Sequence, residues 1–166
     1  MASPRPVPVC RLRFAVLAAC ALGLANCAPP AEDASAAQPA ADAAIEPLRL
    51  LPCPAVEPAE CEADRRLAER DWPKALEGDY QAQRNVSYMF TTRRSWIVTR
   101  PVQGCAWRMV IMATRPTDAV FDDAGMYRIQ CGALSERDLR QARAVANLIH
   151  RRIHGADLPP LPAPTA

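Results

Sequence analysis

The sequence predicts a small all-α domain of paired helical hairpins, and three observations favour this class. Apolar residues recur at helical spacing in several stretches, whereas the alternating pattern of strands is weak. Proline and glycine stand where helices would begin and end, as at Pro101 and Gly155. Both ends of the chain are rich in alanine and proline, which leaves roughly 100 residues between them for one domain.

The last helix carries the strongest signal. Ser135 with Asp138 resembles a capping arrangement, although Asp replaces the usual Glu or Gln. An apolar stripe follows, and Gly155 ends it. The stripe consists of Leu139, Ala142, Ala146, Ile149 and Ile153.

Weaker patterns predict four earlier helices. Pro73 suits the first turn of a helix that reaches about Phe90, and Pro101 opens another that reaches about Ala113. The polar and β-branched residues between them indicate a loop with Trp96 turned inward. The other two helices are expected at 57–69 and at 118–131, the second stopped by Gly132.

The first 27 residues predict export. Three basic residues precede an uncharged apolar run, 14–25, which ends in small residues before Cys27. A basic region, an apolar run and small residues form an export signal. About 12 apolar residues cannot span a hydrocarbon layer of roughly 30 Å, so a retained membrane helix is not expected.

The segment Leu24-Ala25-Asn26-Cys27 resembles the lipobox of bacterial lipoproteins. The resemblance implies that residues 1–26 are cut off, that Cys27 is lipidated, and that the protein is anchored in the periplasm, with the outer membrane favoured. Asn26 departs from the usual Gly, Ala or Ser. Two alternatives stay open, lipidation at Cys20 behind a shorter apolar run and cleavage without lipid.

Cysteine arithmetic predicts two disulfides. The chain has seven cysteines. Removal of the signal takes away Cys10 and Cys20, and lipidation uses Cys27, which leaves Cys53, Cys61, Cys105 and Cys131. An even number in an exported domain indicates disulfides, for which three pairings exist. We prefer Cys53–Cys61 and Cys105–Cys131, because each pair is nearest in sequence. Free buried thiols are the alternative; zinc is disfavoured because no CxxC spacing occurs.

Composition divides the rest of the chain. Residues 27–47 are dominated by Ala, Pro and small polar residues and predict a disordered tether. The helical domain is expected at 48–155, followed by a disordered proline-rich tail, 156–166. The chain has a net charge of +2, but residues 28–166 keep 17 of its 20 basic and all 18 acidic residues, so a nucleic-acid partner is not expected.

Residues 73–113 resemble a Sel-one-like repeat, a helical hairpin related to the tetratricopeptide repeat. Six residues agree with the family pattern: Ala75, Gly78, Asp79, Ala82, Gln83 and Asn85. Ala106, Trp107 and Ala113 resemble its second, alanine-rich helix. The family's Gly-x-Gly-Val loop is missing, and only one repeat is clear. A tetratricopeptide-like unit without true repeats is the rival. The resemblance implies a scaffold that binds other proteins.

Six arginines form the main charge feature, and no Asp or Glu occurs between Asp79 and Asp118. Arginine pairs well with carboxylates and phosphates. We name Arg93, Arg94, Trp96 and Arg100 as candidate binding residues for an acidic protein, lipopolysaccharide phosphates or an anionic cell-wall polymer. The other interpretation is a solvated face balanced by acids elsewhere. The remaining arginines are Arg84, Arg108 and Arg115.

No motif predicts catalysis, so we expect no enzyme activity and no cofactor. His150 and His154 stand four residues apart but flank two arginines, which disfavours a metal. Asp122 and Asp123 are expected at a helix start rather than as a catalytic pair. The sequence therefore predicts an envelope adaptor that binds an unknown envelope protein, with binding of an anionic polymer as the alternative.

Overall fold

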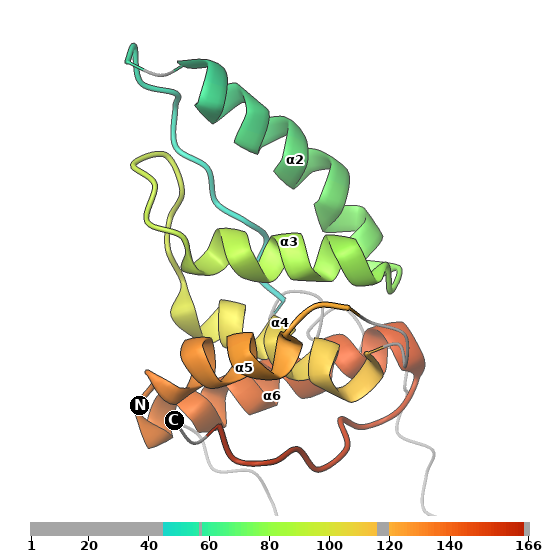
Figure 1. Ribbon diagram of the computed structural model, residues 1–166. Coiled ribbons are helices and arrows are strands. Elements are labelled where there is room, and N and C mark those ends of the chain that lie inside the picture. The colour runs from blue at the N-terminus through green and yellow to red at the C-terminus, as the bar shows by residue number, and fades with distance from the viewer. Residues whose placement is uncertain (1–44, 57, 116–119, 165–166) are drawn as a thin grey trace, which may run out of the picture. The chain divides into compact units, whose positions relative to one another are not determined.

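The computed structural model describes residues 45–56, 58–115 and 120–164, which belong to one compact unit (Figure 1). Its regular elements are α2 (Pro58–Leu76), α3 (Tyr80–Thr91), α4 (Pro101–Thr114), α5 (Asp123–Gly132) and α6 (Glu136–His154). These ranges contain no strand, only a β-bridge between Leu50 and Ile97. The all-α prediction is confirmed. None of the described helices is both long and apolar enough to cross a membrane.

Helix α4 lies at the centre of the fold and packs against α3, α5 and α6. Every residue from Gln103 to Ile111 is buried, so this helix has no solvent face over that stretch. Trp107 is its largest buried side chain and meets Trp72 of α2 edge-on, with ring centroids 5.9 Å apart. The core is therefore built around one helix that must bury whatever polar groups it carries.

Helices α3 and α4 approach each other closely at Gly104. A Cβ atom there would lie 2.4 Å from the Thr91 Cγ2 atom and 3.2 Å from the Ser87 carbonyl oxygen. The Ser87 hydroxyl lies 3.0 Å from the Gly104 carbonyl oxygen. A larger residue at position 104 would push the two helices apart, which makes glycine the fitting residue at this crossing.

The α2–α3 hairpin differs from the prediction. The helix expected from Pro73 starts only at Tyr80, because α2 runs through Pro73 and ends at Leu76. The break falls at Gly78, which has a φ of 95°. Asp79 then caps α3 by accepting a hydrogen bond from the Ala82 N–H at 2.7 Å. A positive φ and a strong N-cap outweigh the preference of proline for a first turn.

The other helix boundaries follow the sequence signals more closely. Ser135 accepts a hydrogen bond from the Asp138 N–H and caps α6, and Gly155 ends it with a φ of 69°. Helix α4 starts at Pro101 as predicted, after a loop in which Trp96 is buried. Helix α5 starts later than predicted; residues 116–119 lie outside the described residues.

Both ends of the domain extend beyond the predicted limits. Ile45 is buried in the main core, three residues before the expected start at 48. The prediction of a disordered tail differs from the structure for residues 156–164. Leu158 is buried and Leu161 packs on the core, so two apolar side chains hold a segment whose prolines suggested disorder. Cys27, the predicted lipidation site, and most of the predicted tether lie outside the described residues.

Both preferred disulfides are formed, which confirms the pairing. Cys53–Cys61 joins the segment before α2 to α2 itself, beside a small cluster of Trp96, Ile97 and Leu50. Cys105–Cys131 joins α4 to α5 inside the main core. The second bond therefore fixes α5, a ten-residue helix, to the centre of the fold.

Replacing the Cys105–Cys131 pair with alanine should lower the free energy of unfolding by about 3–4 kcal/mol, since the bond closes a loop of 26 residues. The same change at Cys53–Cys61, whose separation is eight, should cost about 2–3 kcal/mol. Guanidinium unfolding of both double variants measures the difference. An equal or reversed order would contradict the assigned roles of the two bonds.

Candidate functional site

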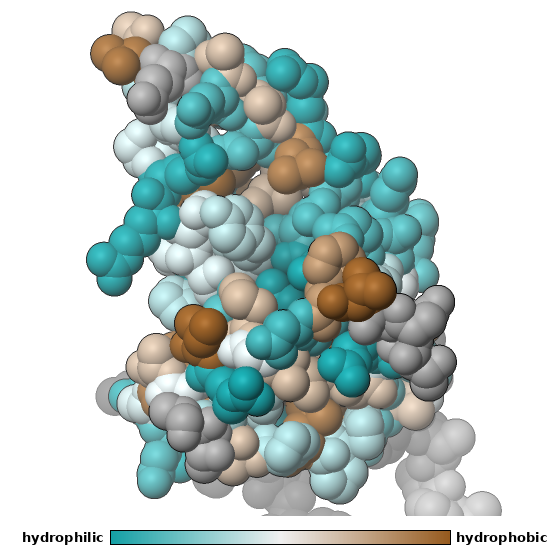
Figure 2. Space-filling model, in the orientation of Figure 1, coloured by the Kyte–Doolittle hydropathy of each residue, from teal (hydrophilic) through white to brown (hydrophobic). Residues whose placement is uncertain are grey.

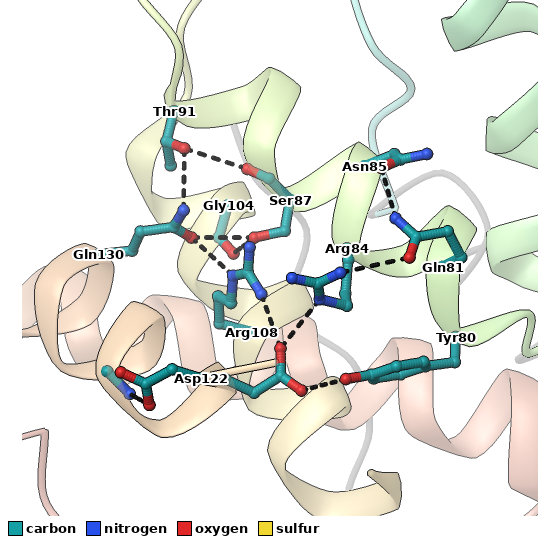
Figure 3. A network of polar contacts seen from close by, with 12 residues as sticks. Tyr80, Gln81, Arg84, Asn85, Ser87, Thr91, Gly104, Arg108, Asp122 and Gln130 are labelled. Atoms are coloured by element: carbon teal, nitrogen blue, oxygen red, sulfur yellow. Dashed lines mark hydrogen bonds and ion pairs between the residues drawn. The ribbon is translucent and has the colours of Figure 1, made fainter. Parts of the chain in front are cut away.

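A buried polar network joins α3, α4 and α5 around the carboxylate of Asp123, which is 0% exposed. Figure 3 shows Tyr80, Arg84, Arg108 and Gln130 of this network. One oxygen accepts from the Arg84 Nε atom at 3.1 Å and from the Arg108 Nη1 atom at 3.2 Å. The other accepts a short hydrogen bond from the Tyr80 hydroxyl. Tyr80 and Arg84 of α3 and Arg108 of α4 therefore all contact Asp123, the first residue of α5.

The network continues through Gln130 of α5. Its Oε1 atom accepts from the Arg108 Nε atom at 3.2 Å and lies 2.9 Å from the Ser87 hydroxyl. Its amide nitrogen donates to the Thr91 hydroxyl at 3.1 Å. Both ends of α5 are therefore tied to α3 and α4 by polar contacts as well as by the disulfide.

Burial governs the ionisation of this network. It lowers the pKa of Arg108, and the nearby Asp123 carboxylate opposes that shift. Burial also raises the pKa of Tyr80, and its hydrogen bond to Asp123 raises it further. Tyrosine therefore stays a neutral donor, and the carboxylate balances an arginine side chain that is only 3% exposed. The arrangement serves to position helices, because solvent does not reach the carboxylate.

The arginine face predicted from the sequence is largely neutralised. Arg84 and Arg108 share Asp123, as described above. Arg94 pairs with Glu60 at 2.7 Å and Asp64 at 3.3 Å, and Arg100 pairs with Glu46. Arg93 and Arg115 are exposed and form no ion pair that the structure shows among the described residues. The balancing acids are Asp123 of α5, Glu60 and Asp64 of α2, and Glu46 of the segment before α2, which agrees with the second interpretation that acids elsewhere in the chain balance these arginines.

The four candidate binding residues do not form one surface. Trp96 is buried and donates from its indole nitrogen to Asp64 at 2.8 Å. Arg94 stands over the Trp96 ring at 5.5 Å and shares the same carboxylate. These two residues close the loop against α2. Arg93 is the member of the set that faces a groove.

That groove lies between α3, the loop that follows it, and α5, and we name it the α3–α5 groove. Its volume is about 430 Å³. Tyr88 and Ile129 are 53% and 68% exposed beside it, which is unusual for large apolar side chains. Figure 2 shows hydrophobic residues on the α5 side of the molecule as small patches within hydrophilic surface. The lining residues are Tyr88, Thr91, Thr92, Arg93, Thr99, Pro101, Met126, Ile129, Gln130 and Ala133.

Two paired motifs of the sequence have structural roles. Asp122 caps α5 by accepting from the Gly125 N–H at 2.7 Å, while Asp123 enters the network, so the two carboxylates diverge as expected. The rings of His150 and His154 lie 4.7 Å apart, and burial lowers the pKa of His154. Within the described residues, no group of three or more His, Cys, Asp or Glu side chains could hold a metal ion.

Sequence reasoning missed Tyr88, Met126 and Ile129 as groove residues. Tyr88 lies within the stretch that resembles the repeat, and the sequence pattern of 118–131 predicts a helix without indicating which of its sides is buried. A clue was present, because Ile129 falls off the stripe formed by the buried Tyr127 and Cys131. Only the packing of α5 against α4 decides which side is left exposed.

No family model matches the chain, and no curated protein or solved structure matches it.

Replacing Asp123 with asparagine should lower the free energy of unfolding by about 3–5 kcal/mol, because Arg108 would keep a buried charge without its partner. The double variant Asp123→Asn with Arg108→Met should cost less than the sum of the single changes. Chemical unfolding of all variants gives the coupling energy.

The exposed pair of Arg140 and Glu136 provides the control. Arg140→Met should cost less than about 1 kcal/mol, as exposed ion pairs usually do. An Asp123→Asn cost as small as that of Arg140→Met would show that the network does not hold the three helices together.

Proposed function

We propose that this protein is a lipid-anchored adaptor of the bacterial cell envelope that binds another protein in the α3–α5 groove. The single observation that carries the binding role is the groove itself, in which exposed Tyr88 and Ile129 flank a hollow of about 430 Å³. The anchor rests on the export signal and the lipobox-like Cys27.

The two disulfides support the export part of the proposal. Disulfides persist in oxidising compartments such as the periplasm and are rare in the cytosol. Both bonds form between cysteines that remain after removal of the signal, and Cys27 is left over for lipid. This division of seven cysteines supports periplasmic anchoring, with the outer membrane favoured.

The contacts of the repeat-like residues support a relation to Sel-one-like scaffolds. Gly78 and Asp79 make the turn and cap between α2 and α3. The Gln83 amide donates to the Ala75 carbonyl oxygen at 3.3 Å, and the Asn85 amide donates to Asp71 at 2.6 Å. Residues that carry the resemblance therefore join α2 to α3, and α3 is the first full helix of the repeat-like hairpin 73–113, which α4 completes.

The lining of the groove defines the chemistry of the partner. Its apolar lining residues include Met126 and Ile129 on α5 and Tyr88 on α3. Arg93 is the charged residue of the lining, and the lining contains no carboxylate. We therefore propose a partner segment that places an apolar side chain between Tyr88 and Ile129 and a carboxylate on Arg93.

Binding of an anionic cell-wall polymer or lipopolysaccharide is the alternative, and it draws less support. A polyanion needs several free cations along one face. Four of the six arginines already face carboxylates, namely Arg84, Arg94, Arg100 and Arg108. Salt separates the two proposals, because binding to a polyanion weakens steeply as ionic strength rises.

Replacing Cys27 with serine should remove the lipid and release the protein from the membrane fraction. Cys20→Ser is the matched control and should leave anchoring intact, because Cys20 would be lost with the signal. Fractionation and mass spectrometry of the N-terminal peptide measure both results. Anchoring that survives Cys27→Ser and fails with Cys20→Ser would move the lipid to Cys20.

Replacing Ile129 with aspartate should lower partner binding at least about tenfold, since a charge would replace an apolar lining residue of the α3–α5 groove. Arg93→Glu should weaken binding by roughly three- to tenfold through loss of the charged contact. Crosslinking from envelope extract, followed by titration of the purified partner at low and at high salt, measures both effects.

Val120→Asp is the matched control, because Val120 is 88% exposed and does not line the groove. It should leave binding unchanged. Equal loss in the Val120→Asp and Ile129→Asp variants would contradict the α3–α5 groove as the binding site. Recovery of glycan or lipopolysaccharide alone, and only at low salt, would favour the alternative.

A further inference from the structure

The segment that follows α6 runs back along that helix as an extended strap (Figure 1). Residues 156–164 contain four prolines, and each proline also biases the residue before it toward extended backbone. Burial along this strap has a period of three. Leu158 is 7% exposed, Leu161 and Pro164 are half-buried, and the residues between them are exposed. A period of three is the repeat of the polyproline II helix.

The surface beneath the strap recognises its backbone as well as its apolar face. The Tyr127 hydroxyl donates to the Pro162 carbonyl oxygen at 3.0 Å. The Asn147 side chain accepts from the Leu158 N–H at 2.8 Å, and Arg143 donates to the Pro159 carbonyl oxygen at 3.4 Å. Aromatic hydroxyls and polar side chains that hold the backbone of a proline-rich segment are how grooves bind polyproline II ligands.

The strap also leaves room in this groove. A cavity of about 200 Å³ lies between Leu161–Pro164 and the side chains of α4, α5 and α6. Its helical walls are Met109, Tyr127, Leu139, Arg140 and Arg143. The strap therefore does not fill this part of the surface.

We propose that α4, α5 and α6 form a recognition groove for proline-rich segments of the pattern Leu-Pro-Pro-Leu-Pro, and that the chain's own tail is its resident, displaceable occupant. A second polypeptide with this pattern would compete with the tail for the same contacts. This site uses the opposite side of α5 from Ile129, through Tyr127, and does not depend on the adaptor proposal above.

The test titrates a labelled peptide of residues 156–166 into two forms of the full chain. In one form, Leu158→Asp and Leu161→Asp release the tail but leave every groove residue in place. This form should bind the peptide at least about tenfold more tightly than the unaltered chain, in which the tail competes at an effective concentration of roughly millimolar. Fluorescence anisotropy gives both affinities.

A peptide of the same composition provides the control. Exchanging only Leu161 with Pro162 sets the two leucines four residues apart, so they cannot share one face of a period-three helix in any register, and this peptide should not bind. Adding Tyr127→Phe to the released form should weaken binding of the original peptide by roughly two- to tenfold, as expected for one hydrogen bond. Circular dichroism confirms that each variant is folded.

Hydrogen exchange of the unaltered chain gives an independent readout should a variant fail to fold. An excess of the peptide should increase exchange at the Leu158 amide, because displacement breaks its bond to Asn147. A strap that is only structural would keep this protection. Equal binding of the two peptides to the released form, or no change in Leu158 exchange, would overturn the proposal.

Discussion

The burial of Arg108 is the constraint on which the rest of the structure depends. Every residue of helix α4 from Gln103 to Ile111 is buried, so the side chain of Arg108 is almost completely shielded from water. A buried cation needs an opposite charge and further hydrogen bonds, and both come from α5 through Asp123 and Gln130. These polar contacts alone already determine where α5 lies against α4. Both proposed binding surfaces include residues of α5.

Much of the fold could be predicted because its signals are local. The cap at Ser135, the stop at Gly155 and the start at Pro101 each depend on a few neighbouring residues. The disulfide pairing was also accessible, since short loops are the easiest to close. The local signal at Pro73 predicted the wrong helix start. Helix α2 continues through Pro73, because Ala68, Asp71 and Ala75 on either side of it are buried against the fold.

The sites were less predictable because they depend on partners far apart in sequence. Nothing near Arg84 or Arg108 shows that Asp123 neutralises them, and nothing near Arg94 points to Glu60. The groove residues Tyr88 and Ile129 are distant in sequence and become neighbours only when α5 docks. The tail differs from these sites, because its signal is local: Leu158, Leu161 and Pro164 stand three residues apart in the sequence. Its proline content suggested disorder, but proline also lowers the entropy lost when an extended segment binds.

A small core explains why so many different contacts converge on α5. The helix has ten residues and buries Asp123, Gly125, Tyr127 and Cys131 on one side. Burial of so little apolar surface would hold it weakly. The disulfide at Cys131, the ion pairs of Asp123 and the strap at Tyr127 each add a different kind of contact. The opposite side of α5 is not needed to hold the helix in place, so Ile129 can remain exposed and Met126 half-buried on a rigid support, which lowers the entropy cost of binding a partner.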